Sequence, residues 1–410
     1  MPNELPLNWC ECKLEIVCAL DSGLKQNGLD LPLLDAKYLR GKKEAEYRQE
    51  GVVLNPEDYV ILVDGENSGE IFSIYETGIM GSTFKKLSFS KFCSVPYALF
   101  FIRSKQDLFR TNKKGAAIPH LDKTLFKNLT FPLPPLAEQE RIVEKIEALF
   151  AGIDEGIERL KSAQAKIKQY RQSVLKSAFE GKLYKTTDWK EVQLKDVCEF
   201  KSGNTIDTKL EKSSGSIPYI KVGDMNLSEN SISIVTSSRF VDMVDIKQNQ
   251  LIPTGSVIFP KRGGAIATNK KRKVIKPIII DLNTMAIIPS DKLHTDFFYF
   301  WILKIDLMKL SNGGNIPQIN NYSFDKVTIP LPSLPEQQHI VEEIEKRFAV
   351  ADELEKAVNE GLEKADKLKQ SILKKAFEGK LVAQNPNDEP ASILLARIQK
   401  EQKPTKGKKK

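Results

Sequence analysis

The side chains best suited to bind a nucleic acid follow a short apolar segment in the second half of the chain. Residues 256–259 predict a β-strand, and Lys261, Arg262 and Gly263 come shortly after it. Lysine and arginine bind phosphate oxygens, whereas arginine on guanine or asparagine on adenine supplies base choice. A glycine-rich loop projects such cations and its own amides into a groove. We therefore predict a DNA contact at this loop; the alternative is a solvated hairpin tip.

Other basic and amide side chains form smaller groups that are further predicted DNA contacts. In the second half these are Asn269, Lys270, Lys271, Arg272 and, weaker, Lys221. In the first half they are Arg40, Lys42, Lys43, Lys85, Lys86, Lys113 and Lys114. Glu44 and Glu46 follow the first of these groups, so an ordinary exposed helix face with paired charges explains it equally well. A basic tail, Lys406 and Lys408 to Lys410, is suited to non-specific binding.

The sequence lacks the motifs of a nucleotide-binding enzyme. It contains neither a Gly-x-x-x-x-Gly-Lys-Ser/Thr phosphate loop nor a Gly-x-Gly-x-x-Gly turn. Residues 55–58 and 385–388 superficially resemble the Asn-Pro-Pro-Tyr type of amino-methyltransferase motif, but they lack its second proline and its aromatic residue, so we expect turns. No nucleophile–base pair emerges from the spacing. We predict no catalytic residue, with a self-contained nuclease or methyltransferase as an alternative.

The cysteines and histidines do not predict a metal site. Zinc takes four ligands, and the chain has 5 cysteines and 3 histidines. Cys10, Cys12 and Cys18 fit a core strand better, because Cys18 matches Cys198, which has no such neighbours. An odd, sparse set of cysteines favours a reducing cytoplasm over a disulfide framework. No stretch approaches the ~20 apolar residues of a membrane-spanning helix, so we expect a cytoplasmic protein.

The positioning elements follow from an internal repeat. Residues 132–183 recur as residues 330–381 at a constant offset of 198 without a gap, from Pro-Leu-Pro through Glu-Gln and Ile-Val-Glu to Ala-Phe-Glu-Gly-Lys-Leu. The preceding segments, domain 1 (1–131) and domain 2 (184–329), both begin with a Trp…Leu…Val-Cys…Ser-Gly pattern but differ in their middles. With 410 residues, of which 41% are hydrophobic, there is ample material for packed cores. The net charge of +8 allows a nucleic-acid partner, although domain 1 by itself is neutral.

The repeated segments predict two helices of about 45 residues, each roughly 67 Å long. Prolines precede both, and Gly181 and Gly379 stand where each should stop. Apolar residues recur every seven positions and predict a coiled-coil seam, with Gly156 and Gly361 allowing close approach. The predicted seam residues are Ile146, Ile153, Leu160, Ile167, Val174, Ile344, Val358, Leu368 and Ile372. We expect the helices to pack antiparallel on each other; the alternative is that each packs on its own domain.

These features together resemble the specificity subunit of type I restriction-modification systems. The resemblance covers essentially the whole chain and depends on the two helix starts, the two Ala-Phe-Glu-Gly-Lys-Leu ends and the duplicated domain starts. It implies an α+β fold in which two mixed α/β target recognition domains, 1–131 and 184–329, are joined by two long antiparallel coiled-coil helices with pseudo-two-fold symmetry. The helices would be a central conserved one at 132–183 and a distal one at 330–381, followed by a short helix and the basic tail at 382–410.

The resemblance also implies the partners. Each recognition domain would read one half of a split sequence in double-stranded DNA, with the helices as a spacer. Two modification (methyltransferase) subunits and restriction (motor-nuclease) subunits would join the chain, and S-adenosylmethionine, ATP and Mg²⁺ would belong to those subunits, with no cofactor on this chain. We thus expect a non-catalytic DNA-specificity subunit. The competing interpretation is a coiled-coil adaptor that does not bind DNA.

Overall fold

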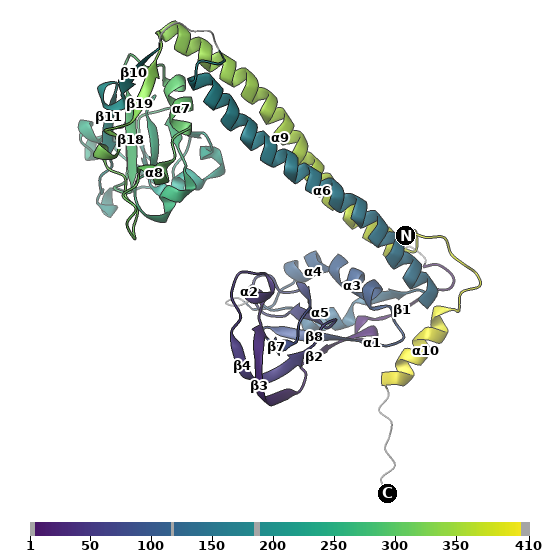
Figure 1. Cartoon of the computed structure of the whole chain (residues 1–410). Helices are drawn as coiled ribbons and strands as arrows, with labels where there is room; N and C mark the ends of the chain where they lie inside the picture. Colours follow the sequence, from purple (N-terminus) through teal and green to yellow (C-terminus); the bar gives the residue numbers. More distant parts are fainter. Residues whose placement is uncertain (1–4, 116–118, 184–188, 403–410) are drawn as a thin grey trace. The chain divides into compact units, whose positions relative to one another are not determined.

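The chain divides into two compact units (Figure 1). The first unit comprises Met1–Leu160 and Glu360–Lys410, and the second comprises Lys161–Asn359. The structure is a computed structural model and describes residues 5–115, 119–183 and 189–402. The predicted basic tail lies outside these residues. Each unit contains one globular domain together with part of each long helix.

In both domains the first and last strands pair with each other just before a long helix begins. In domain 1, β1 (Cys10–Lys13) runs antiparallel to β9 (Thr130–Leu133). In domain 2, β10 (Lys190–Gln193) runs antiparallel to β19 (Thr328–Leu331). The long helix starts three residues after the last strand in each case. The Pro-Leu-Pro motif thus joins the closing strand directly to the helix.

Domain 1 contains a four-stranded sheet and a small closed barrel. The sheet has the order β2-β8-β5-β6, formed by Cys18–Asp21, Phe84–Phe89, Tyr59–Leu62 and Ile71–Ser73. The barrel consists of β3 (Lys25–Leu34), β4 (Tyr47–Leu54) and β7 (Gly78–Met80). The helices are α1 (Leu14–Val17), α2 (Ala36–Leu39), α3 (Val95–Ser104), α4 (Gln106–Thr111) and α5 (Lys123–Asn128).

Domain 2 repeats this plan with a divergent middle. A five-stranded sheet has the order β11-β18-β15-β16-β13, formed by Cys198–Ser202, Thr284–Pro289, Val257–Pro260, Arg272–Val274 and Ser233–Ile234. A second sheet consists of β14 (Phe240–Val241), β12 (Ile217–Ile220) and β17 (Ile279–Ile280). Helices α7 (Thr295–Leu303) and α8 (Leu307–Leu310) follow, and short 3₁₀ turns occupy much of the remainder.

The two long helices are α6 (Leu136–Phe179) and α9 (Leu334–Phe377), each uninterrupted over 44 residues. Each ends just before a glycine with positive φ, Gly181 at +70° and Gly379 at +68°. This left-handed conformation closes a helix at little cost when the residue is glycine. The predicted ends of both helices therefore agree with the structure.

Within the first unit, α6 and α9 contact each other through polar and small residues. The Lys369 ammonium lies 2.5 Å from an Asp154 carboxylate oxygen and 5.1 Å from the centre of the Phe150 ring. Further along the helices, a Cβ atom built on Gly361 would lie 3.0 Å from Leu160 Cδ1. Gly361 therefore allows close approach, as expected, whereas a Cβ on Gly156 would meet open space.

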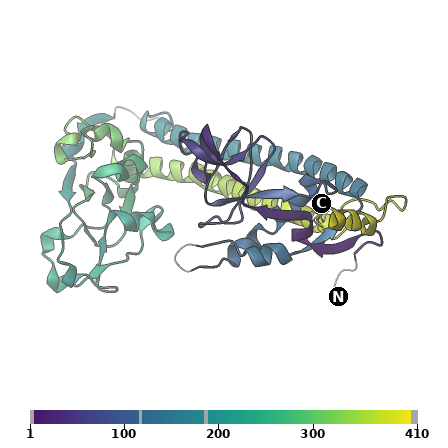
Figure 2. The same ribbon diagram turned by 90° about the horizontal axis from the view of Figure 1, so that it is seen from below.

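The second unit repeats these contacts with the roles of the helices exchanged. Arg171 of α6 forms an ion pair with Asp352 and lies 3.0 Å from Glu355, and its guanidinium covers the Phe348 ring at 5.1 Å. Arg171, Asp352 and Phe348 stand 198 positions from Lys369, Asp154 and Phe150. As the contacting residue on α6 advances from 154 to 171, its partner on α9 falls from 369 to 352. The helices are therefore antiparallel, as the ribbon also shows (Figure 2), and the predicted α+β fold is confirmed.

The seam is partly different from the heptad prediction. The predicted residues Ile146, Ile167, Val174, Ile344, Val358 and Ile372 are buried, and Ile153 and Leu160 are half-buried. Leu368, however, is 51% exposed, and Lys369 faces α6 in its place. Leu354, fourteen residues before Leu368, is also 51% exposed, whereas Ile372, nearer the end of the helix, is buried. The position within the seven-residue repeat, and not the distance along the helix, therefore decides which of these side chains face inward.

A buried glutamine attaches each long helix to its domain. The Gln139 carboxamide oxygen accepts a hydrogen bond from the Ser94 amide at 2.9 Å, just before α3, and Gln337 accepts one from His294 at 2.7 Å, just before α7. Each side-chain nitrogen donates to a proline carbonyl five residues earlier at 2.9 Å. Both glutamines are fully buried. The Glu-Gln pair of the repeat thus has a structural role.

A last helix, α10 (Ala391–Gln402), packs on domain 1 near α1 and β1. Leu394 and Ile398 are buried in the same core as Leu14 and Val17. The preceding turn is held by an ion pair between Arg141 and Asp388 at 2.5 Å. Among the residues that the structure describes, no helix is both long and apolar enough to cross a membrane.

Replacing Gln337 by alanine is expected to destabilise the second unit by about 1–3 kcal/mol, because a buried amide and a buried carbonyl lose their partner. The measurement is the denaturant midpoint of unfolding of the full chain. Gln338→Ala is the matched control, since Gln338 is exposed and bonds only to Glu342 on its own helix. Equal midpoints for the two variants would contradict the role assigned to Gln337.

Candidate nucleic-acid interface

The predicted basic loop of domain 2 is held rigidly at the end of β15. This strand is buried along its whole length between β18 and β16. The Lys261 amide donates to Asn283 O at 2.8 Å, and the Gly263 amide donates to Pro317 O at 2.8 Å. Gly263 has a φ of +72°, a conformation that favours glycine. The strand and these bonds fix where the loop presents its side chains.

Two cations of this loop are available to a ligand. The Lys261 ammonium donates to the Ser202 hydroxyl at 3.0 Å. Burial and the neighbouring Arg262 lower its pKa. The Arg262 side chain is exposed and makes no hydrogen bond or ion pair with the residues that the structure describes. The loop therefore combines a positioned ammonium with a free guanidinium, which suits phosphate and base contacts respectively.

The second basic group, residues 269–272, has a structural role that the sequence did not reveal. Lys271 is only 2% exposed, and its ammonium donates to Ile305 O at 2.6 Å and to Asn269 Oδ1 at 2.9 Å. The same Asn269 oxygen accepts from the Leu307 amide at the start of α8. Arg272 donates to two backbone carbonyls. The predicted DNA contact of Lys271 is therefore wrong in this structure, because its ammonium is used inside domain 2.

The remaining predicted cations of domain 2 are partly neutralised or bonded. Lys221 lies 2.7 Å from Glu211, which also binds Arg239 at 3.0 Å. Lys270 donates to the side chain of Asn226. These positions present less free positive charge than Lys261 and Arg262.

In domain 1 most predicted cations face a carboxylate. The pairs are Arg40–Glu70, Lys43–Asp35, Lys43–Glu46, Lys86–Asp58, Lys113–Glu66 and Lys114–Asp122. Lys85 instead donates to the Ser22 hydroxyl at 2.7 Å, and Lys42 is exposed. Exposed ion pairs contribute little to stability, but they reduce the charge offered to a phosphate. Lys42 and Lys85 are consequently the predicted DNA contacts of domain 1 that the geometry favours.

Both domains place a lysine on the same serine of the repeat. Ser22 and Ser202 belong to the matching Ser-Gly starts, and each hydroxyl accepts from a lysine ammonium. Lys85 comes from β8, whereas Lys261 follows β15. The sequence shows no correspondence between these two lysines, yet the fold brings both to the same end of the sheet.

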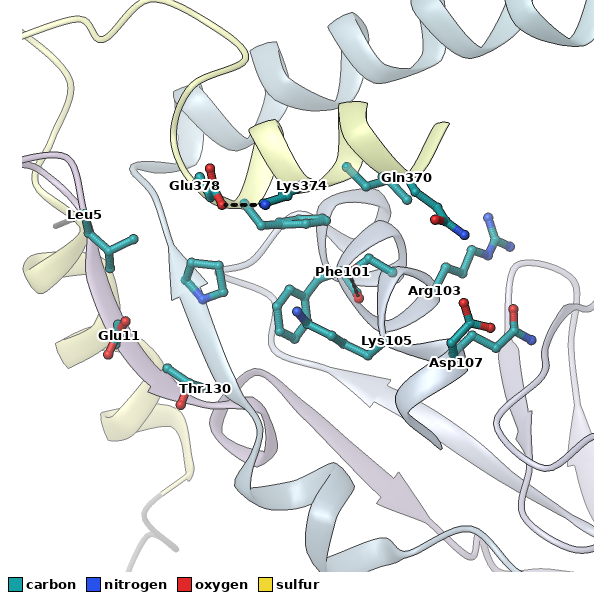
Figure 3. Close-up of a pocket in the computed structure, with 15 residues that line it drawn as sticks. Leu5, Glu11, Phe101, Arg103, Lys105, Asp107, Thr130, Gln370, Lys374 and Glu378 are labelled. Carbon is teal, nitrogen blue, oxygen red and sulfur yellow. Dashed lines mark hydrogen bonds and ion pairs between the residues drawn. The ribbon is translucent and has the colours of Figure 1, made fainter. Parts of the chain in front are cut away.

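A cavity of domain 1 is lined by none of these loop residues (Figure 3). Arg103 of α3, Lys105 directly after it, Asp107 of α4 and Lys374 of α9 line it. Its lining mixes both signs of charge and includes neither histidine nor cysteine. In the described part of the chain, no group of three or more histidine, cysteine, aspartate or glutamate side chains could hold a metal ion.

The cysteines have no reactive thiolate character. Burial raises the pKa of Cys12 and of Cys198 to about 12, and it raises the pKa of Cys18 and Cys93 still further. A thiol in this state is a poor nucleophile and a poor metal ligand at neutral pH. Cys18 and Cys198 are the first residues of β2 and β11, and both side chains are buried. This agrees with the core-strand interpretation for these two cysteines.

Comparison with known proteins assigns the family. The sequence matches the family model described as "Type I restriction modification DNA specificity domain" twice, over residues 13–163 and 186–364. The chain belongs to this family. Each matched segment begins at the start of a domain and extends into the long helix that follows it, so the DNA specificity family accounts for both copies of the repeat.

Individual relatives cover nearly the whole chain. The type I restriction enzyme MjaVIII specificity subunit of Methanocaldococcus jannaschii is 27% identical over 382 residues, 87% of each chain. The EcoKI specificity subunit of Escherichia coli strain K12 is 26% identical and covers 99% of this chain and 98% of its own length. A solved chain described as "Structural basis underlying complex assembly and conformational transition of the type I R-M system" has a TM-score of 0.71 at 20% identity, covering 92% of this chain and all of its own, which shows a shared fold.

One hydrogen-bonded pair of this DNA specificity chain was not predicted from the sequence. Asp64 and His120 of domain 1 are joined by a 2.7 Å hydrogen bond, and neither residue was a predicted contact. Counting 198 positions onward from them leads to Arg262 and Gln318 of domain 2. The repeat offset was therefore the signal that could have found them.

Lys271 predicts a pH dependence of stability. Burial lowers its pKa to about 8, below the ~10.4 of an exposed lysine. The unfolded chain therefore holds this proton between about pH 8 and pH 10, whereas the folded chain has lost it. The free energy of unfolding should therefore rise with pH in this window because of Lys271. Below the window the lysine is charged in both states, and burial of that charge destabilises the folded chain.

The Lys271→Met variant should lose this rise, which is measured by comparing unfolding midpoints at pH 7 and pH 9.5. Lys276→Met, at an exposed position, controls for the other groups that titrate there. If the unfolding midpoint of Lys271→Met rises with pH as steeply as that of the unmodified chain, the assignment is refuted.

Proposed function

We propose that the chain is the DNA-sequence-specificity subunit of a type I restriction-modification complex. Domain 1 and domain 2 each read one half of a bipartite target in double-stranded DNA. The observation that carries the proposal is the duplication itself: two copies of one scaffold, matched twice by the DNA specificity family, present different polar side chains at corresponding loops. An adaptor that only binds proteins would not need an unpaired Arg262 and two serine-bound lysines.

The helix pair acts as the spacer between the two half-sites. Its ion pairs recur in both units, and neither α6 nor α9 contains a proline that would kink it beyond its first turn. The length of this helical connection sets how many base pairs are left unread. Two readers on one face of DNA favour half-sites about one helical turn, roughly 10 base pairs, apart.

The chemistry belongs to partner subunits in this proposal. Two modification (methyltransferase) subunits would bring S-adenosylmethionine, and restriction (motor-nuclease) subunits would bring ATP and Mg²⁺. The chain itself is non-catalytic and works in the cytoplasm. Its part is to place the modification subunits where a target base can be extruded from the duplex, as methyltransferases require.

The Lys261→Gln variant should bind DNA several-fold more weakly than the unmodified chain. It should also reduce the slope of log affinity against log salt concentration by about one, since one phosphate contact is lost. The measurement is a salt titration of duplex binding by the full chain with its modification subunits.

Lys86→Gln is the matched control for this titration, because Lys86 is already neutralised by Asp58 at 2.7 Å. Equal slopes for both variants would exclude Lys261 as a phosphate contact. Binding by no variant at any salt concentration would favour the adaptor instead.

Lengthening both helices should widen the unread spacer. An insertion of eleven residues between positions 160 and 161 and between 358 and 359 adds about three helical turns, so each helix keeps nearly the same face towards its partner, and it lengthens the pair by about 16 Å. The modified site, mapped by sequencing methylated bases in cells, should then have half-sites that are further apart but unchanged in sequence.

The control is the same insertion in α6 alone, which shifts α6 against α9, separates partners such as Arg171 and Asp352, and should reduce methylation. An unchanged spacer in the doubly lengthened protein, with methylation intact, would refute the spacer role.

A further inference from the structure

One backbone arrangement appears in both domains at the end of the central strand. In domain 1 the Gly65 amide donates to Pro119 O at 2.8 Å, and the Leu121 amide donates to Val63 O at 2.8 Å. In domain 2 the corresponding bonds run from Gly263 to Pro317 at 2.8 Å and from Ile319 to Lys261 at 2.9 Å. A third bond also matches, from Val63 to Thr83 and from Lys261 to Asn283, both at 2.8 Å. We call residues 63–65 with 119–121, and 261–263 with 317–319, the paired loops.

The paired loops carry unrelated side chains at their central positions. Asp64 faces His120 across an isolated β-bridge in domain 1, and Arg262 faces Gln318 across the equivalent bridge in domain 2. Solvent reaches these positions: the side chains of Asp64 and His120 are 36% and 47% exposed, and Arg262 is exposed. A scaffold that preserves its backbone bonds while changing its exposed side chains is suited to specificity rather than to stability.

In domain 1 the side-chain pair presents a defined hydrogen-bonding edge. His120 Nδ1 lies 2.7 Å from Asp64 Oδ1. Because a carboxylate only accepts, this bond places the imidazole proton on Nδ1 and leaves Nε2 of the neutral ring as an acceptor. An acceptor in the major groove suits the amino groups of adenine and cytosine.

In domain 2 the first of these positions presents only donors. The Arg262 guanidinium offers the two parallel N–H groups that match guanine O6 and N7. The Gln318 amide nitrogen donates to Asn320 Oδ1 at 3.3 Å, which orients its carboxamide beside Arg262. The two domains therefore differ in hydrogen-bonding character at corresponding positions.

Each paired loop lies near a cation suited to a phosphate. Lys261 belongs to the loop of domain 2 and contacts Ser202. Lys85, which contacts Ser22, pairs in register with Ile61 of β5, the strand that leads into the loop of domain 1. A phosphate contact next to a base-reading pair is the arrangement by which proteins fix their register on DNA.

We propose that Asp64 with His120, and Arg262 with Gln318, are the specificity-determining pairs of the two domains. His120 reads an amino-bearing base, adenine or cytosine, in one half-site, and Arg262 reads a guanine in the other. This rests on the proposed function, because it requires both domains to bind DNA. Asp64 is a positioning residue that fixes the ring of His120.

The test maps methylated bases in a host that carries the full chain with its modification subunits. His120→Leu should relax or change the base preference in one half-site only, and Arg262→Ala should do so in the other half-site only. The discrimination lost at the affected base should be about 5- to 150-fold. The spacer and the opposite half-site should stay the same.

Asp64→Asn separates positioning from packing. An asparagine can present either its oxygen or its amide to His120 Nδ1, so both ring tautomers become available. The preference at the base read by His120 should therefore relax, without a change elsewhere. His339→Leu, on an exposed histidine of α9, is the control and should leave the whole motif unchanged.

Two outcomes separate the possible failures. If the unmodified chain directs no bipartite methylation, the proposed function itself fails. If it does, while His120→Leu and Arg262→Ala leave both half-sites unchanged, the paired loops do not read bases and the inference is overturned. Where a variant abolishes methylation, the same complex selects duplexes from a randomised pool, and an unaltered preference there overturns the inference equally.

Discussion

The attachment of each long helix to its domain depends on one buried carboxamide. Gln139 and Gln337 bridge the first turn of the helix and the residue before α3 or α7, and both are fully enclosed. Buried polar groups with all their bonds made specify one geometry, because any other arrangement leaves them unsatisfied. The direction in which each helix leaves its domain is thereby determined by the three hydrogen bonds of its glutamine side chain. The rest of the arrangement builds on that direction.

The helix pair is held together by apolar contacts that are interrupted by charge. Arg171 and Lys369 occupy positions where an apolar residue would be expected, and each lies over a phenylalanine ring while contacting carboxylates. A cation over an aromatic face gains about 0.5–2 kcal/mol, depending on how far water is excluded. Its larger effect is on specificity, since a helix shifted by one turn would separate these charges from their partners. The polar contacts therefore select the register, while the apolar residues provide the attraction.

The sequence predicted the architecture because repetition and proline placement are local signals. The 198-residue offset located both helices and their ends at Gly181 and Gly379. The heptad prediction placed Leu368 in the seam wrongly, because the packing of the two helices decides which companion position of the repeat faces the partner. A one-dimensional pattern does not report that packing.

The candidate site was harder to predict than the fold. A run of basic residues looks the same whether it is solvated or folded inward, and Lys271 is held in part by the Ile305 carbonyl oxygen, 34 residues away in the sequence. The carboxylates that neutralise Lys86 and Lys113 are likewise distant along the chain. Charge pairing of this kind is a property of the tertiary structure. The equivalence of Lys85 and Lys261 was similarly invisible, because the two lysines come from different strands.

The packing of α10 on domain 1 has a consequence for synthesis of the chain. The core that contains Leu14 and Val17 is completed by Leu394 and Ile398, which are synthesised after the whole of the second unit. The second unit, by contrast, is one continuous segment, Lys161–Asn359. Because translation proceeds from the amino terminus, the later half of the protein can acquire its full hydrophobic interior while the earlier half still waits for its closing piece. The portion made first is thus the last to be finished.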